Sequence, residues 1–134
     1  MTPRAITGVG VASALGIGRD EVLAAYRRGD VAGRGRGVET FDAKAYPDAR
    51  VAEVRGFDAT KYLGDKGLRA LDRLAKLLVV AGRLALHDAG MKRDGAWAPG
   101  VSSPGPDHVG LVCSNAYGSL EAITELDRVA LLED

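Results

Sequence analysis

Few residues in this chain have the types and spacing that a catalytic or metal-binding site requires. Cys113 lies in the apolar run Val109–Ser114, without the neighbouring cation that would lower the pKa of a reactive thiol. His87 and His108 form no H-x-x-x-H or H-E-x-x-H pair, and no serine lies in a G-x-S-x-G turn. We therefore predict no catalytic residue and no metal site, and we expect Cys113 to be a buried, inert thiol.

The glycines near the start of the chain could suggest a dinucleotide site, but their spacing disfavours one. Gly8 and Gly10 begin a G-x-G pattern whose third glycine would fall at position 13, where Ser13 stands. The helix predicted next begins about nine residues after Gly10 rather than immediately. The sequence thus predicts no cofactor, and it favours glycines that permit a tight turn and close packing.

Three basic residues stand at the start of the most strongly predicted helix. Lys66, Arg69 and Arg73 lie close together in sequence, and Asp65 and Asp72 could pair with them. On the residues alone, two interpretations remain open. They form either a solvated first turn or a docking patch for an acidic partner.

Composition excludes several classes of function. The chain has 134 residues, 46% hydrophobic and 27% charged, and its 18 basic and 18 acidic residues cancel. Because the net charge is zero, we expect no general attraction to nucleic acid or to a membrane surface. With one cysteine and no visible secretion signal, we expect a cytoplasmic setting.

The predicted helices and strands follow an α/β pattern in one domain, residues 1–134. Hydrophobic periodicity and turn residues predict strands at 4–11 and 107–113, a possible strand at 50–55, helices at 19–28, 66–89 and 120–132, and a flexible loop at about 91–106. We expect Gly90 to end the long helix and Ser119 to cap the last. Both firmly predicted strands read as buried on both faces, and two strands cannot form a stable sheet alone. The sequence therefore predicts part of a larger, mostly parallel sheet.

Three segments together resemble the β-ketoacyl synthases, the condensing enzymes of fatty acid and polyketide synthesis. They are the opening segment 4–16, the segment 66–73, and the segment 109–121, in the order and spacing of that family. The resemblance implies the N-terminal half of a thiolase-like fold with a long core helix. It also implies decarboxylative Claisen condensation of acyl and malonyl thioesters. In the family this reaction uses a catalytic cysteine and two catalytic histidines, and neither Cys113 nor His87 nor His108 stands in the motifs of those residues.

This omission leaves three hypotheses. The chain is an N-terminal segment or subunit of a condensing enzyme, completed by a complementary chain or a C-terminal continuation. Alternatively, it is a non-catalytic subunit that binds a carrier protein or modulates a synthase. The third hypothesis is a stand-alone α/β domain. We expect the chain alone to be inactive, and we expect a dimer or a hetero-oligomer.

The resemblance also assigns roles to individual residues. Lys66 and Arg69 fall at positions where the family contacts acyl carrier protein, and Arg73 belongs to the same basic group. Tyr117 falls where the family places a residue that lines the acyl pocket. A bulky ring there would shorten the space for an acyl chain.

Overall fold

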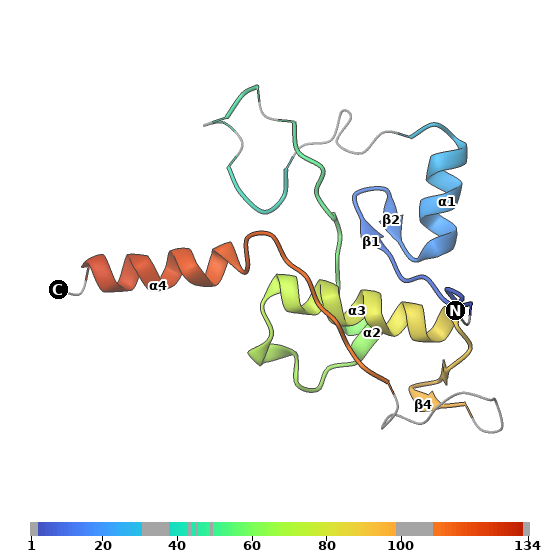
Figure 1. Ribbon diagram of the computed structural model, residues 1–134. Helices are drawn as coiled ribbons and strands as arrows, with labels where there is room; N and C mark the ends of the chain where they lie inside the picture. Colours follow the sequence, from blue (N-terminus) through green and yellow to red (C-terminus); the bar gives the residue numbers. More distant parts are fainter. Residues whose placement is uncertain are drawn as a thin grey trace.

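The computed structural model describes residues 3–30, 38–42, 44, 46–48, 50–98 and 109–132. In chain order these residues form β1 (Ala12–Ser13), β2 (Gly16–Ile17), α1 (Arg19–Arg27), α2 (Thr60–Leu63), the 3-10 helix η2 (Leu68–Ala70), α3 (Arg73–Asp88), β3 (Lys92–Arg93), β4 (Ala96–Trp97) and α4 (Leu120–Leu132). Figure 1 shows α3 at the centre, with α1 and the β1–β2 hairpin on one side and α4 extending away on the other.

The helix predicted at 19–28 is confirmed as α1, and local sequence explains its ends. Asp20 and Glu21 lie in the first turn, where the helix dipole favours carboxylates. At the other end Gly29 has φ +74°, its N–H donates to Tyr26 O, and the N–H of Asp30 donates to Ala25 O. These two bonds form a Schellman motif, which satisfies the last carbonyls of the helix.

The long helix is shorter than the predicted range 66–89. Gly67 has φ +79° and Leu71 is extended, so η2 and a turn precede α3. Asp72 is the N-cap, because its carboxylate accepts the N–H of Ala75 at 2.6 Å. The predicted stop is confirmed: Gly90 has φ +69° and its N–H donates to a carbonyl in the last turn of α3.

The opening segment lies directly on α3 through two glycines. A Cβ added at Gly10 would overlap Ala81 O and lie 2.5 Å from Ala85 N. A Cβ at Gly8 would lie 2.5 Å from the N atom of Ala89. The predicted role of these glycines in close packing is therefore confirmed.

Asp88, at the end of α3, connects three parts of the chain by a hydrogen bond and an ion pair. One carboxylate oxygen accepts the N–H of Val9 at 2.9 Å, and the other lies 2.6 Å from the guanidinium of Arg19. The end of α3, the opening segment and the start of α1 therefore meet at one carboxylate.

Part of the predicted loop at 91–106 is instead a β-hairpin. Strands β3 and β4 pair antiparallel, with Lys92 opposite Trp97, around a turn at Asp94 and Gly95. Both turn residues have positive φ, 49° and 83°, which is the backbone that a two-residue Asp-Gly turn requires. The residues from 99 onward in that loop lie outside the described part of the chain.

The predicted sheet is not formed by the described residues. Both sheets, β1–β2 and β3–β4, are two-stranded and antiparallel. The described residues of the predicted strands at 4–11 and 107–113, and those at 50–55, form no strand; β1 begins just after the first of these ranges. The prediction of strands is therefore wrong for the described residues of these ranges, because no neighbouring strand among the described residues pairs with them.

Little of the apolar surface is buried. Among the described residues only Ala25, Ala59 and Val80 are buried apolar side chains. Large apolar side chains on α3, on the segment 109–113 and on α4 are exposed; among them are Leu78, Val112, Leu126 and Leu131. Such surface is costly in water. Within the described ranges, no helix is both long and apolar enough to cross a membrane.

Candidate functional site

An open groove of about 1660 Å³ lies where α3 and α4 both begin. One side carries the basic residues Arg69 of η2 and Arg73 and Lys76 of α3. Its α4 side carries Glu121 and Glu125. The aromatic and apolar lining comes from the segment before α3 and from η2, and includes Phe41, Phe57, Leu68 and Leu71. The groove therefore has a basic wall, an acidic wall and a wall of aromatic and apolar side chains.

The first residues of the two helices are joined at this groove. The Ser119 hydroxyl, beside Asp72, lowers the pKa of the Asp72 carboxyl, and the N–H of Ala75 lowers it further. Ser119 also accepts the N–H of Ile123 with its carbonyl oxygen, at 3.1 Å. Ser119 directly precedes α4, and its side chain contributes to the cap of α3 through Asp72, while its predicted role as the cap of α4 stays a prediction.

The three basic residues predicted for docking occupy different environments. Lys66 lies in the turn before η2, is exposed and does not line the groove. Arg69 lies on η2, is exposed and lines the groove. Arg73, the first residue of α3, is half-buried; its guanidinium donates to Val54 O and lies 5.6 Å from the centre of the Phe57 ring. The structure thus brings Arg69 and Arg73 to one groove and leaves Lys66 beside it.

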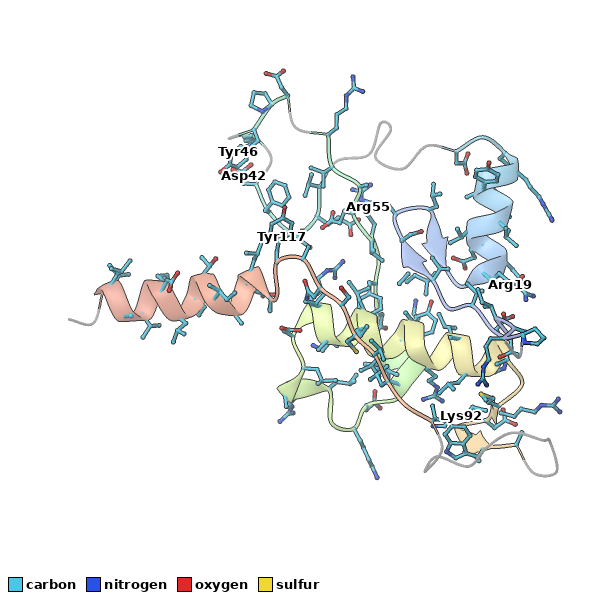
Figure 2. All side chains as sticks on the ribbon, viewed as in Figure 1. Arg19, Asp42, Tyr46, Arg55, Lys92 and Tyr117 are labelled. Atoms are coloured by element: carbon cyan, nitrogen blue, oxygen red, sulfur yellow. The ribbon has the colours of Figure 1, made fainter. Side chains whose placement is uncertain are left out.

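Tyr117 lies in the turn that leads into α4, outside the groove lining (Figure 2). Asn115 shapes this turn: its side-chain oxygen accepts the N–H of Tyr117 at 3.0 Å and that of Gly118 at 2.9 Å. The Tyr117 ring is 77% exposed. The predicted pocket role of Tyr117 stays a prediction.

The remaining reactive side chains do not gather into a site. Cys113 is exposed, so the prediction of a buried thiol is wrong, because the segment 109–113 that carries it has no sheet around it among the described residues. His87 lies exposed in the last turn of α3, and His108 lies outside the described residues. In the described part of the chain no three His, Cys, Asp or Glu side chains are grouped to hold a metal ion.

Sequence reasoning missed two features of the groove. Lys76 lies one helical turn after Asp72, so it faces the same side of α3, a spacing that the sequence does contain. Glu53 accepts the N–H groups of Glu39 and Thr40 at 2.7 and 3.0 Å, and so shapes the wall formed by Phe41. No sequence pattern signals this second contact, because it closes an irregular loop.

Comparison with known proteins gives consistent relatives. The chain is 31% identical over 123 residues to a putative polyketide beta-ketoacyl synthase 2 of Streptomyces virginiae, covering 90% of this chain and 28% of that protein. It is 34% identical over 94 residues to the tetracenomycin polyketide synthase ketoacyl synthase beta subunit of Streptomyces glaucescens, covering 67% of this chain and 22% of that protein. It is 33% identical over 86 residues to the chloroplastic 3-oxoacyl-[acyl-carrier-protein] synthase I of Hordeum vulgare, covering 64% of this chain and 18% of that protein.

The chain spans between 18% and 28% of the length of these relatives. No family model matches the chain, and no solved structure matches it with significance.

Proposed function

Because the chain belongs to the β-ketoacyl synthase family, we propose that residues 1–134 form the N-terminal part of a condensing enzyme. The proposed reaction joins an acyl thioester to a malonyl thioester with loss of carbon dioxide. The observation that carries this proposal is the similarity to a polyketide beta-ketoacyl synthase over 90% of the chain.

We place the reacting residues outside residues 1–134. A condensing enzyme needs a thiolate that accepts the acyl group and histidines that assist decarboxylation. Cys113 and His87 are both exposed, on separate elements, and no contact joins them. The role proposed for this segment is therefore to build the scaffold and a carrier-docking face, within a complete enzyme that has the mostly parallel thiolase-like sheet.

The exposed apolar surface supports a larger assembly. Leu111 and Val112 are 81% and 96% exposed, and within the described residues neither belongs to a strand. The proposed neighbour is a continuation of the polypeptide or a complementary chain, and the proposed assembly is a dimer or a hetero-oligomer. A reducing, cytoplasmic compartment is the proposed setting, since the chain has one cysteine.

Acyl carrier protein is the proposed partner of the basic residues. Lys66 and Arg69 are both exposed and stand three residues apart beside the open groove, where an acidic carrier could reach them. Exposed charges of this kind act through salt-dependent attraction, so they affect the rate and affinity of docking more than the stability of the fold.

A second candidate function is a non-catalytic subunit that binds a carrier protein or modulates a synthase. It is favoured by the 34% identity to a protein named as a ketoacyl synthase beta subunit. The two candidates share the docking face and differ in whether the complete polypeptide itself transfers an acyl group.

One experiment separates the two candidates. The natural protein, with whatever chain accompanies it, is incubated with acyl carrier protein that carries a radiolabelled acyl group. Covalent transfer of the labelled acyl group is measured beside carrier binding. Transfer to the polypeptide that contains residues 1–134 supports the condensing enzyme. Carrier binding with acyl transfer only to another chain supports the subunit, and the absence of both contradicts the proposal.

A carrier-docking variant tests the face itself. Arg69→Glu should weaken carrier affinity about 10-fold at low salt and flatten its salt dependence, because a favourable charge is reversed. Arg128→Glu is the matched control, since Arg128 pairs with Glu125 at 2.6 Å on α4 and does not line the groove. Equal effects of both variants would contradict docking at the predicted face.

A further inference from the structure

Two segments before α3 are clasped to one another by a pair of carboxylates. We call residues 38–42 and 50–57 the strap. The Glu53 carboxylate accepts the N–H groups of Glu39 and Thr40, one on each oxygen, at 2.7 and 3.0 Å. In return the Glu39 carboxylate accepts the N–H of Gly56 at 3.2 Å and lies 3.3 Å from Nε of Arg55. Each segment therefore supplies a carboxylate to the backbone or side chains of the other.

One residue of α3 anchors the clasped strap. The Arg73 guanidinium donates to Val54 O, next to Glu53, and lies over the Phe57 ring at 5.6 Å. The Thr40 hydroxyl and then the N–H groups of Glu39 and Thr40 lower the pKa of the Glu53 carboxyl, and the Arg73 charge adds a smaller lowering. A planar guanidinium can donate and stack at once, which a lysine ammonium cannot reproduce.

The strap forms a wall of the groove. Thr40, Phe41 and Phe57 belong to the strap, and all three line the groove. Arg55 lies on the part of the strap that descends towards α3 (Figure 2). The position of this wall therefore depends on the clasp between Glu39 and Glu53 and on the anchor at Arg73.

We propose that Arg73 is a positioning residue: with Glu53 it fixes the strap as the wall of the groove, rather than contacting a docked partner itself. The inference goes beyond the proposed function, because the contacts that carry it are within this chain and do not depend on which ligand enters the groove. It also separates Arg73 from Arg69, whose exposed side chain has no such anchoring contact among the described residues.

The decisive substitutions change one property at a time. Glu53→Gln keeps the size of the side chain but replaces one of its two acceptor oxygens with a donor, so it can accept only one of the two N–H groups. Arg73→Lys keeps the charge but loses the planar fork. Arg69→Lys and Glu125→Gln are the matched controls, because neither residue contacts the strap in the described structure.

Hydrogen–deuterium exchange of the natural protein is the test. We expect the amides of Glu39, Thr40 and Gly56 to exchange at least about 10-fold faster in Glu53→Gln and in Arg73→Lys, with no change in either control. The double variant should exchange little faster than the single variants, because both act on one clasp. Unchanged exchange in the α1 peptides shows that the fold is intact.

Three results would overturn the inference. Arg73→Lys with wild-type protection of the strap amides would show that charge alone suffices, and equal loss of protection in α1 would show general destabilisation. Carrier binding, measured in parallel, keeps the two proposals apart. If Arg73→Gln lowers the salt dependence of carrier affinity as much as Arg69→Gln does, Arg73 is a contact residue and the inference fails. If no carrier binds, the docking proposal fails while the exchange result still decides the role of Arg73.

Discussion

Gly10 lies against the carbonyl oxygen of Ala81 so closely that no side chain fits between them. The opening segment thereby approaches the α3 backbone itself, at a point where most residues would hold two elements apart. Gly8 repeats this approach one turn further along α3, and Asp88 secures the same segment at the helix end. The glycines at the start of the chain are therefore packing residues.

Gly10→Ala should destabilise the fold by about 1–3 kcal/mol, because the added methyl group meets helix backbone that cannot move aside. Gly82→Ala is the matched control. Gly82 lies within α3 with no heavy atom near an added Cβ, so that variant should be neutral or more stable by about 0.5–1 kcal/mol. Urea unfolding of the natural protein measures both, and equal destabilisation by the two variants would contradict the packing role.

The cap of α3 gives a prediction about pH. The folded pKa of Asp72 lies below its ordinary value of 3.8, through the Ser119 hydroxyl and then the Ala75 N–H. A carboxyl with a lowered pKa stabilises the fold above its ordinary pKa, and this contribution is lost as the pH falls through the folded value. Asp72→Ala should lower Tm by about 5 °C at neutral pH, and by less as the pH falls below the ordinary pKa of 3.8.

Asp72→Asn separates the cap from the charge. Asparagine is a good N-cap, so this variant should keep most of the thermal stability at neutral pH. It should lack the part of the acid sensitivity that Asp72 contributes. Thermal melts from about pH 2.5 to pH 7 measure both effects. A Tm loss in Asp72→Asn as large as in Asp72→Ala would argue against the cap.

Tyr117 gives a prediction about substrate length, on the proposed function. In the complete enzyme, Tyr117→Ala should raise kcat/KM for a longer acyl group relative to a shorter one by about 10-fold, because removing the ring lengthens the space available. Tyr117→Phe should leave the ratio unchanged, since it keeps the bulk. An unchanged ratio in Tyr117→Ala would place the ring outside the acyl pocket.

The exposed apolar face of α4 gives a prediction about association. Ile123 and Leu126 are 48% and 69% exposed, and residues 1–134 alone should therefore self-associate and bind a hydrophobic dye. Leu126→Glu should reduce both signals at least two-fold, whereas Thr124→Glu, on the polar face of the helix, should not. Analytical ultracentrifugation measures the effect. A monomer that unfolds cooperatively would contradict the prediction.

The sequence predicts α1 and the end of α3 well because their signals are local, whereas α2 was not predicted. Asp20 and Gly29 bound α1, and Gly90 ends α3, each through contacts within a few residues. The start of α3 was missed by several residues because Gly67 and the capping carboxylate of Asp72 outweigh an apolar periodicity that continues across them. The Asp94–Gly95 hairpin was missed although its turn dipeptide is a known signal.

The sheet and the groove depend on partners distant in sequence. The predicted strand at 107–113 has the composition of a buried strand, yet Leu111 is exposed because pairing needs a neighbour that the described residues do not supply. The clasp at Glu53 likewise joins residues 13 and 14 positions apart through an irregular loop. The family resemblance is confirmed by the curated relatives, whereas the docking and pocket roles stay predictions.

The central claim is that residues 1–134 work as part of a larger condensing enzyme. Native mass spectrometry of the protein purified from its own source tests it most directly. We predict that this 14.0 kDa sequence is found within a longer polypeptide or in a complex with a larger complementary chain, and that this species transfers acyl groups. A lone 14.0 kDa monomer that neither transfers an acyl group nor binds a carrier protein would contradict the account.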